Sequence, residues 1–254
     1  MGMEGTAFWL LAVVAAFFVG MSKGGLPMAG TVAVPILALA ISPVTAAGLL
    51  LPVYVISDMF GLWAYRKEFN RRVLAIVVSG AVVGIGLGWV VAALATGADE
   101  ERWVTLVVGL IGLAFVLNRL VQHRKVTEAR PARVGPGLFW GAVTGFTSFV
   151  SHSGGPPYQV YTLPLKMSRT MFAGTTTVAF AIINAVKLIP YYFLGQLNPH
   201  NLQVAALLAI PAAAAVYFGV WLVKVMNEKL YFGLIYGMLF LLSLKLVWDG
   251  VTGG

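Results

Sequence analysis

Long apolar runs separated by short polar segments dominate the chain. Six of these runs approach or exceed the roughly 18 to 20 residues that a helix needs to cross the hydrocarbon core of a bilayer. Strands of an outer-membrane barrel would be about half as long and would alternate between apolar and polar residues. The pattern therefore predicts an all-α integral membrane protein. The six runs are Val44–Tyr65, Val73–Thr96, Trp103–Leu120, Thr170–Leu194, Leu202–Val223 and Leu230–Trp248.

Two pairs of shorter apolar segments precede these runs, one pair in each half of the chain. The first pair is Thr6–Gly20 and Met28–Ile41, and the second is Leu138–Phe149 and Gln159–Lys166. At 1.5 Å per residue, each member of the first pair covers only about 21 to 23 Å, less than the roughly 30 Å core. Each pair could be a re-entrant hairpin or two tilted short spans. The second pair is shorter still, which favours re-entrant elements.

A glycine- and proline-rich break separates the two segments of each pair. The first break is F-V-G-M-S-K-G-G-L-P, from Phe18 to Pro27, and the second is F-V-S-H-S-G-G-P-P, from Phe149 to Pro157. Short hydrophobic segments interrupted by Gly and Pro at matching places in two halves are typical of a transporter's binding site. We therefore expect these two breaks to form the functional site.

Composition supports a membrane location and narrows the chemistry. Of 254 residues, 59% are hydrophobic and 10% are charged, whereas soluble domains are about 45–50% apolar. The mean hydropathy is +0.88. The absence of cysteine excludes disulfides and thiolate metal sites, and His123, His152 and His200 are too scattered to suggest a metal site. We expect no cofactor, no metal and no enzymatic activity.

The distribution of charge predicts the orientation in the membrane. The net charge is +8, but in a membrane protein its placement matters more than its sum, and we expect no nucleic-acid partner. The basic loop 66–72 and the linker 119–133 are expected in the cytoplasm, and the acidic loop around Asp99 outside. The N-terminus is then outside. Residues 1–16 contain Glu4 and no Lys or Arg, so we expect them to be retained rather than cleaved as a signal peptide.

The linker divides the chain into two similar halves. We expect a first membrane repeat at residues 1–120, a basic cytoplasmic linker at 121–136 and a second membrane repeat at 137–254. Each half holds a short broken pair and three long helices, an odd number of segments, so the two repeats should have inverted topology. The matching positions across the linker include the Gly-Gly-x-Pro of both breaks, Ala47-Gly48 with Ala173-Gly174, Asp58 with Asn184, and Gly109 with Gly237.

The residues of the two breaks suit a small anion. Serine hydroxyls donate hydrogen bonds, paired glycines let backbone amides approach a ligand, and proline begins a helix whose N-terminus favours negative charge. The alternative without a binding function is that both breaks only connect tilted membrane spans, and that the side chain of Lys23 extends to the membrane–water interface. The predicted substrate-binding residues are Ser22, Lys23, Gly24, Gly25, Pro27, Ser151, His152, Ser153, Gly154, Gly155, Pro156, Asn184 and Lys187.

Ionisable residues inside the predicted spans are further candidates. Asp58 lies within one long run and Lys187 within another, and ionisable groups in a membrane mark ion pathways or proton relays by default. Asp58 and Lys187 could form a structural buried pair, or Lys187 could line the anion path. Asp58 and His152 are the candidates for proton coupling.

With G-x-x-x-G-G-x-P at Gly20–Pro27, the S-G-G-P-P repeat, the basic loop and the central linker, the chain resembles the TauE/SafE sulfite exporter family over almost its whole length. The resemblance implies export of sulfite or of a small organosulfonate such as sulfoacetate across the inner membrane. Related thiosulfate importers use cysteines, which this chain lacks.

Three classes of function stay open at this point. The first is a secondary transporter that works by alternating access, with the anion held at paired helix N-termini near the midplane. The second is an anion channel in which the breaks form a filter. The third, a membrane-embedded enzyme, would need a cluster of acids, histidines or a metal that the sequence lacks. The expected partners are a small anion, the lipid bilayer and protons. The sequence leaves the oligomeric state open, a homodimer included.

Overall fold

The computed structural model describes residues 5–41, 43–94, 99–121, 128–150, 153–193 and 199–252. All regular structure in these ranges is helical, and no strand occurs in them. The all-α prediction is therefore confirmed. The break residues Ser151 and His152 lie outside the described residues.

Each of the six long apolar runs forms one long helix, as predicted. The helices begin or end a few residues beyond several of the runs, because helical hydrogen bonding continues into the polar residues that flank an apolar stretch. The six are α3 (Pro43–Ala64), α4 (Arg71–Leu94), α5 (Asp99–Val121), α8 (Arg169–Phe193), α9 (Pro199–Val225) and α10 (Glu228–Thr252).

The short segments form helices whose bounds differ from the expected ones. The first, α1 (Thr6–Lys23), continues three residues past the expected end at Gly20 and has 18 residues. It is followed by the 3-10 helix η1 (Pro27–Val32) and the six-residue α2 (Ala33–Ala38). In the second half, α6 (Val134–Val150) is followed by the eight-residue α7 (Gly155–Thr162) and the 3-10 helix η3 (Leu163–Leu165).

Within the described residues, five helices are long and apolar enough to cross a membrane. One of them is α1, which reaches spanning length because it does not stop at Gly20. The chain is a multi-pass membrane protein. The five stretches are Thr6–Lys23, Arg71–Val91, Arg169–Pro190, Gln203–Val225 and Glu228–Thr252.

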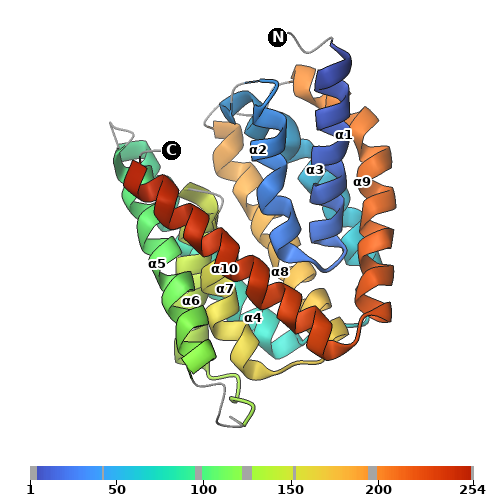
Figure 1. Ribbon diagram of the computed structural model, residues 1–254. Helices are drawn as coiled ribbons and strands as arrows, with labels where there is room; N and C mark the ends of the chain where they lie inside the picture. Colours follow the sequence, from blue (N-terminus) through green and yellow to red (C-terminus); the bar gives the residue numbers. More distant parts are fainter. Residues whose placement is uncertain are drawn as a thin grey trace. The chain divides into compact units, whose positions relative to one another are not determined.

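The helices group into two compact units, and each unit takes helices from both halves of the sequence (Figure 1). Unit 1 comprises residues 1–69 and 169–227, and therefore holds α1, η1, α2, α3, α8 and α9. Unit 2 comprises residues 70–168 and 228–254, and holds α4, α5, α6, α7, η3 and α10. The spatial units thus cut across the two sequence halves.

In unit 1, α1 and α9 lie side by side (Figure 1) and approach closely through glycines. A Cβ at Gly20 would overlap the carbonyl oxygen of Ala212, and one at Gly24 would lie 2.7 Å from Cα of Gly219. Gly20 contacts Ala212, and the later residue Gly24 contacts the later residue Gly219, so the two helices run parallel. Gly20 does not end α1, since a glycine inside a helix is retained where it permits close packing.

Unit 2 has a matching parallel pair, α4 and α6, and an antiparallel pair, α5 and α10. A Cβ at Gly80 or Gly84 of α4 would overlap backbone atoms of α6, and one at Gly145 would overlap the carbonyl oxygen of Ala81. These are the glycine-rich faces that small-residue packing between membrane helices requires. In the second pair, Gly109 of α5 faces Val247 of α10.

Candidate functional site

The first break folds back on the end of α1, and two of its backbone amides form hydrogen bonds to carbonyl groups of that helix. The amide of Gly24 donates to the carbonyl of Gly20 over 2.9 Å, and the amide of Leu26 donates to Met21 over 3.2 Å. Gly25 has φ of +109°, a conformation that favours glycine. Pro27 then begins η1 at its first position. The chain thus reverses tightly between α1 and η1.

Carbonyl groups of this break accept hydrogen bonds from α3, α8 and the residue after α3. Thr177 donates from Oγ1 to the carbonyl of Lys23 over 3.1 Å, and Tyr65 donates from its hydroxyl to the carbonyl of Gly24 over 2.7 Å. Burial raises the pKa of Tyr65, so this phenol stays a donor at neutral pH. The hydroxyl of Tyr54 donates to the carbonyl of Gly30 over 2.7 Å. The break is held from several sides inside unit 1.

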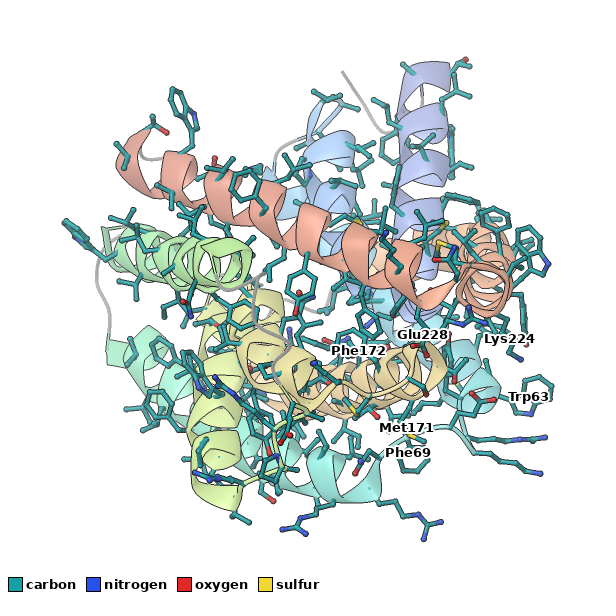
Figure 2. The ribbon with its side chains drawn as sticks, turned by 60° about the horizontal axis from the view of Figure 1, so that its bottom comes forward. Trp63, Phe69, Met171, Phe172, Lys224 and Glu228 are labelled. Carbon is teal, nitrogen blue, oxygen red and sulfur yellow. The ribbon has the colours of Figure 1, made fainter. Side chains whose placement is uncertain are left out.

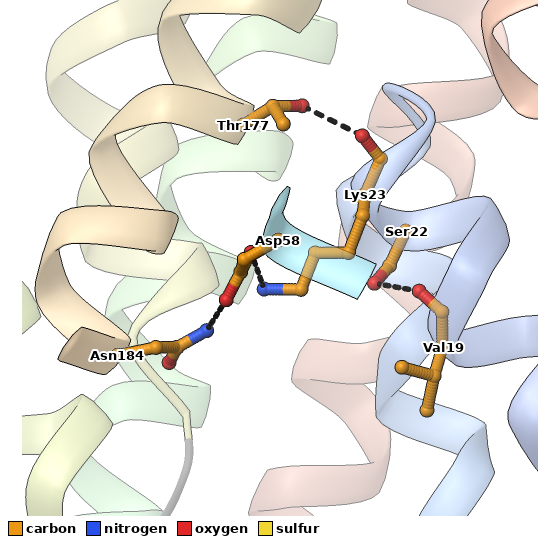
Figure 3. Close-up of polar contacts among 6 residues, drawn as sticks. All are labelled: Val19, Ser22, Lys23, Asp58, Thr177 and Asn184. Atoms are coloured by element: carbon orange, nitrogen blue, oxygen red, sulfur yellow. Dashed lines mark hydrogen bonds and ion pairs between the residues drawn. The ribbon is translucent and has the colours of Figure 1, made fainter. Parts of the chain in front are cut away.

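The side chain of Lys23, at the end of α1, forms an ion pair with Asp58 on α3. Lys23 Nζ lies 2.7 Å from Asp58 Oδ1, and each side chain is only 6% exposed (Figure 3). Lys23 Nζ also lies 5.3 Å from the centroid of the Tyr54 ring, within the range of a cation–π contact. Lys23 is therefore part of a buried charged network rather than a lysine that reaches an interface.

The second oxygen of the same carboxylate is bound by Asn184 on α8. Asn184 Nδ2 donates to Asp58 Oδ2 over 2.8 Å (Figure 3). Both carboxylate oxygens of Asp58 are therefore engaged, one by an ammonium group and the other by an amide. A buried carboxylate without partners would be very costly, and this arrangement gives Asp58 a partner at each oxygen.

A second lysine, Lys187 on α8, also belongs to this network. Lys187 follows Asn184 by three residues, so the two side chains lie on the same face of α8. Lys187 is 3% exposed and is close enough to Lys23 and Asp58 to interact electrostatically with both. We call Lys23, Asp58, Asn184 and Lys187 the buried charge cluster.

The charged side chains of the buried charge cluster are removed from water, which costs free energy. Burying charges costs several kcal/mol per ion even in real proteins, and removing one partner of a buried pair typically costs about 3–5 kcal/mol. With both lysines protonated and Asp58 ionised, the three charged side chains sum to one positive charge. An excess of positive charge in a region of low dielectric favours the binding of an anion.

Ser22 lies beside Lys23 but faces its own helix. Its hydroxyl donates to the carbonyl of Val19 over 2.7 Å, and its side chain is buried (Figure 3). A hydroxyl bonded to the preceding turn still has lone pairs that accept hydrogen bonds. In this structure the side chain of Ser22 is therefore buried against its own helix, next to the ion pair.

The second break, in unit 2, leads from α6 into α7. The amide of Ser153 donates to the carbonyl of Thr147 over 3.2 Å, which folds the chain back on α6. Gly154 is the N-cap of α7, and Gly155, Pro156 and Pro157 occupy its first three positions. The expectation that proline begins the helix after each break is confirmed at Pro27, whereas α7 begins at Gly155 and has Pro156 at its second position.

The structure brings together only part of the predicted site. Within unit 1 it gathers Lys23, Asn184 and Lys187 with Asp58, and places Gly24 and Gly25 directly after Lys23. Ser153, Gly154, Gly155 and Pro156 belong to unit 2. The role of these residues in substrate binding stays a prediction.

Sequence reasoning missed several residues that hold this site. Thr177 and Tyr65 bind the break through carbonyl groups, and hydrogen bonds to a backbone carbonyl leave no pattern in a sequence. Tyr54 offered a signal, because it lies four residues before Asp58 and therefore one helical turn away on the same face. A polar aromatic side chain one turn from an intramembrane acid is a candidate neighbour of that acid.

The comparison with family models matches residues 11–246 to the model described as "Sulfite exporter TauE/SafE". The chain belongs to this family. The TauE/SafE match covers both breaks and every residue of the buried charge cluster. Comparisons with curated protein sequences and with solved structures gave no significant match.

Membership of the TauE/SafE family fixes the general class of function. It makes this chain a membrane transporter and not an enzyme. The family description also names a sulfur anion and export as the direction of transport, so a small anionic substrate and the lipid bilayer are its partners.

Proposed function

We propose that the protein exports sulfite or a small organosulfonate such as sulfoacetate by alternating access, and that the anion binds at the buried charge cluster. The observation that carries this proposal is the presence of two buried lysines, Lys23 and Lys187, beside a single carboxylate whose two oxygens are already engaged. A sulfite or sulfonate group supplies the negative charge that balances the cluster. Its oxygens accept charge-assisted hydrogen bonds from ammonium and amide groups.

The cluster also suggests which side chain contacts the anion. Asp58 would repel an anion if it were exposed, but Lys23 and Asn184 cover its oxygens. Lys187, one turn beyond Asn184, extends the cationic side of the cluster. In this proposal Lys187 binds the anion directly, while Lys23 and Asp58 hold the break and the helix α3 in place. Protonation of Asp58 would release Lys23, which is how protons could be coupled to transport.

The packing of glycine-rich helices supports two inverted repeats. In the proposed alignment α1 corresponds to α6 and α9 corresponds to α4. The parallel pair α1 with α9 then matches the parallel pair α6 with α4, and both pairs approach through glycines. An inverted repeat commonly places the substrate near the midplane and moves one part of the protein against another.

The connections between the two units support such a movement. The chain passes between unit 1 and unit 2 after Phe69, Ser168 and Asn227, and all three points lie in short segments between helices. Basic residues flank them, and by the positive-inside rule we expect the three connections on the cytoplasmic side. Connections on one side allow hinge movement that opens the other side. The basic residues are Arg66, Lys67, Arg71, Arg72, Lys166, Arg169, Lys224 and Lys229.

Part of this basic end is visible in unit 1. Figure 2 shows Trp63, Phe69, Met171 and Lys224 where α3 ends, α8 begins and α9 ends. Arg169 donates from Nη2 to the carbonyl of Lys224 over 2.9 Å, and the guanidinium of Arg66 lies 4.8 Å from the ring centroid of Trp63. Aromatic and basic side chains together are typical of a membrane interface. We place this end in the cytoplasm of a cell with an inner membrane, the N-terminus outside and the central linker inside.

Uptake of labelled sulfite into proteoliposomes tests the proposal. The purified chain is reconstituted, and flux is measured with and without an imposed membrane potential or pH gradient, with sulfoacetate, sulfate and chloride as competitors. Saturable flux that sulfoacetate competes and that shows counterflow supports an exporter working by alternating access. Flux that does not saturate and shows no counterflow indicates a channel, and no flux from folded protein under any gradient contradicts the proposal.

A further inference from the structure

Unit 2 contains a second group of buried polar side chains, which is separate from the buried charge cluster. Thr144 on α6, Gln159 on α7 and Ser243 on α10 are each 0% exposed. The hydroxyl oxygens of Thr144 and Ser243 and both side-chain polar atoms of Gln159 have no hydrogen-bond partner in the described part of the chain. A buried polar group without a partner is rare in native proteins and calls for an explanation.

Other buried hydroxyls nearby do find partners within their own helix. Thr147 donates to the carbonyl of Val143, and Thr162 donates to the carbonyl of Tyr158, each over 2.8 Å. The hydroxyl of Thr144 is buried on the same helix as that of Thr147 but makes no such bond. The lack of partners at Thr144, Gln159 and Ser243 is therefore not a general feature of the buried hydroxyls of this unit.

Gln159 has the largest unused hydrogen-bonding capacity of the three. Its amide offers two N–H donors and a carbonyl oxygen with two lone pairs. The bond from Cα to Cβ of a helical residue tilts toward the N-terminus of its helix. At the fifth position of α7, Gln159 therefore leans toward the turn that holds Gly155 and Pro156.

The backbone at the start of α7 offers few donors of its own. Pro156 and Pro157 lack N–H groups. The amide of Ser153 donates to the carbonyl of Thr147, and that of Tyr158 donates to the carbonyl of Gly154. An anion at this break would therefore depend mainly on side chains for its hydrogen bonds, which makes the unused groups of Gln159 and its neighbours the relevant ones.

Ser243 is held against the same turn of α7 by a glycine of α5. A Cβ at Gly112 would overlap Oγ of Ser243 and would lie 3.2 Å from Cβ of Pro156. Ser243 from α10 and Pro156 from α7 therefore both lie against the same point on α5. Thr144 lies one turn before Thr147, whose carbonyl holds Ser153. The three polar side chains thus come from helices that meet at the second break.

We propose that Thr144, Gln159 and Ser243 form a recognition site for a singly charged sulfur oxyanion that carries one O–H group, as hydrogen sulfite does. This inference rests on the proposed function, since it concerns the sulfite that the protein is proposed to export and adds a second site, in unit 2, to the buried charge cluster of unit 1. The amide N–H groups and the hydroxyls donate to the oxygens of the anion, and Oε1 of Gln159 accepts from its O–H. These three side chains carry no charge, and the cost of burying an ion without a countercharge rises steeply with its charge. A singly charged anion is therefore preferred over the sulfite dianion.

Equilibrium binding of labelled sulfite to the purified full chain in detergent tests this site. Gln159→Met keeps a similar side-chain length and removes both polar groups. We expect it to weaken sulfite binding about ten-fold or more, the equivalent of one or two lost hydrogen bonds. We also expect wild-type protein to bind sulfite more tightly in mildly acidic than in mildly alkaline buffer, because acid favours hydrogen sulfite. Methanesulfonate, which has no O–H group, should compete weakly at this site, so between the two anion classes of the proposed function the site favours sulfite over organosulfonates.

The matched control is Thr162→Val. Thr162 is buried in the same helix, but its hydroxyl already donates to Tyr158, so this variant should bind sulfite with unchanged affinity. Without ligand, Gln159→Met should unfold at a higher temperature than wild type, because it removes a buried group without partners. A glutamine needed only for structure would give the opposite shift.

Unchanged sulfite affinity in Gln159→Met overturns the proposal. If that variant yields no folded protein, Ser243→Ala, which removes only a hydroxyl, gives the same test, with about three-fold weaker binding expected and unchanged affinity overturning it. Binding does not require transport, so the two proposals separate. If sulfite binding depends on Gln159 but proteoliposomes show no flux, this site is supported and the exporter is contradicted. If flux is saturable but sulfite affinity does not depend on Gln159, the exporter is supported and this site is contradicted.

Discussion

Asn184 donates a hydrogen bond to Asp58 over 2.8 Å, although the two residues are 126 positions apart in the chain. They occupy matching positions in the two proposed repeats, one as an acid and the other as its uncharged counterpart. An acid at both positions would place two carboxylates side by side, and like charges disfavour ionisation at so short a distance. The asymmetry of this matched pair therefore lets Asn184 donate to Asp58 while Asp58 pairs with Lys23.

The ion pair of Lys23 and Asp58 should dominate the stability of unit 1. Lys23→Met leaves a buried carboxylate with only Asn184 as partner, and Asp58→Leu leaves a buried ammonium group. We expect each single substitution to lower the free energy of unfolding by about 3–5 kcal/mol. The double variant should recover most of that loss, since it removes both charges of the pair and leaves neither without its partner. Thermal unfolding in detergent measures the three variants, and a double variant no more stable than either single one would contradict the pairing.

Lys187 should matter for transport more than for folding. Lys187→Met leaves Asp58 with Lys23 and Asn184, so we expect a folded protein whose sulfite flux falls at least about ten-fold, equivalent to about 1.4 kcal/mol of binding. Lys187→Arg keeps the charge and should retain part of the flux. The measurement is initial-rate sulfite uptake in proteoliposomes. Lys245→Met is the control, because Lys245 is exposed and pairs with Asp249. Equal flux in Lys187→Met and Lys245→Met would exclude Lys187 from the anion site.

Gly25 should tolerate no larger residue. Its φ of +109° is strained for other residues, and a Cβ there would lie 2.6 Å from the hydroxyl oxygen of Tyr65 and 2.8 Å from Cβ of Ala173. We expect Gly25→Ala to lower the free energy of unfolding by about 1–3 kcal/mol. Gly86→Ala is the matched control, since a Cβ at Gly86 in α4 meets nothing within 4 Å. That substitution should stabilise by about 0.5–1 kcal/mol. Denaturation in detergent compares the two, and equal effects would contradict the tight turn.

The orientation in the membrane can be tested directly because the chain has no cysteine. A single cysteine in place of Lys67, in the basic loop after α3, should react with an impermeant maleimide only after the cells are opened. A cysteine in place of Gly5, just before α1, should react in intact cells. The physical reason is that basic loops stay on the cytoplasmic side. Labelling in the reverse order would show that the proposed orientation is inverted.

The helices and their membrane location followed from the sequence because both depend on local properties. Apolar runs of about 20 residues leave a helix as the way to satisfy the backbone in a bilayer, and α3, α4, α8, α9 and α10 appear where those runs are. The end of α1 was placed three residues too early. Gly20 resembles a helix stop in the sequence, but it lies inside α1 because α9 packs against it.

The sequence by itself determined the membrane class, the two breaks and the identity of the intramembrane charges, since hydropathy and residue type are properties of each position. Only the tertiary structure decided which charges meet. The pairing of Lys23 with Asp58 leaves no pattern in the sequence, and Gln159 did not stand out in an apolar segment until its two polar atoms proved to have no partner in the described part of the chain. Such partners come from helices far apart in the chain, and a periodic pattern records which face is buried but not what that face contacts.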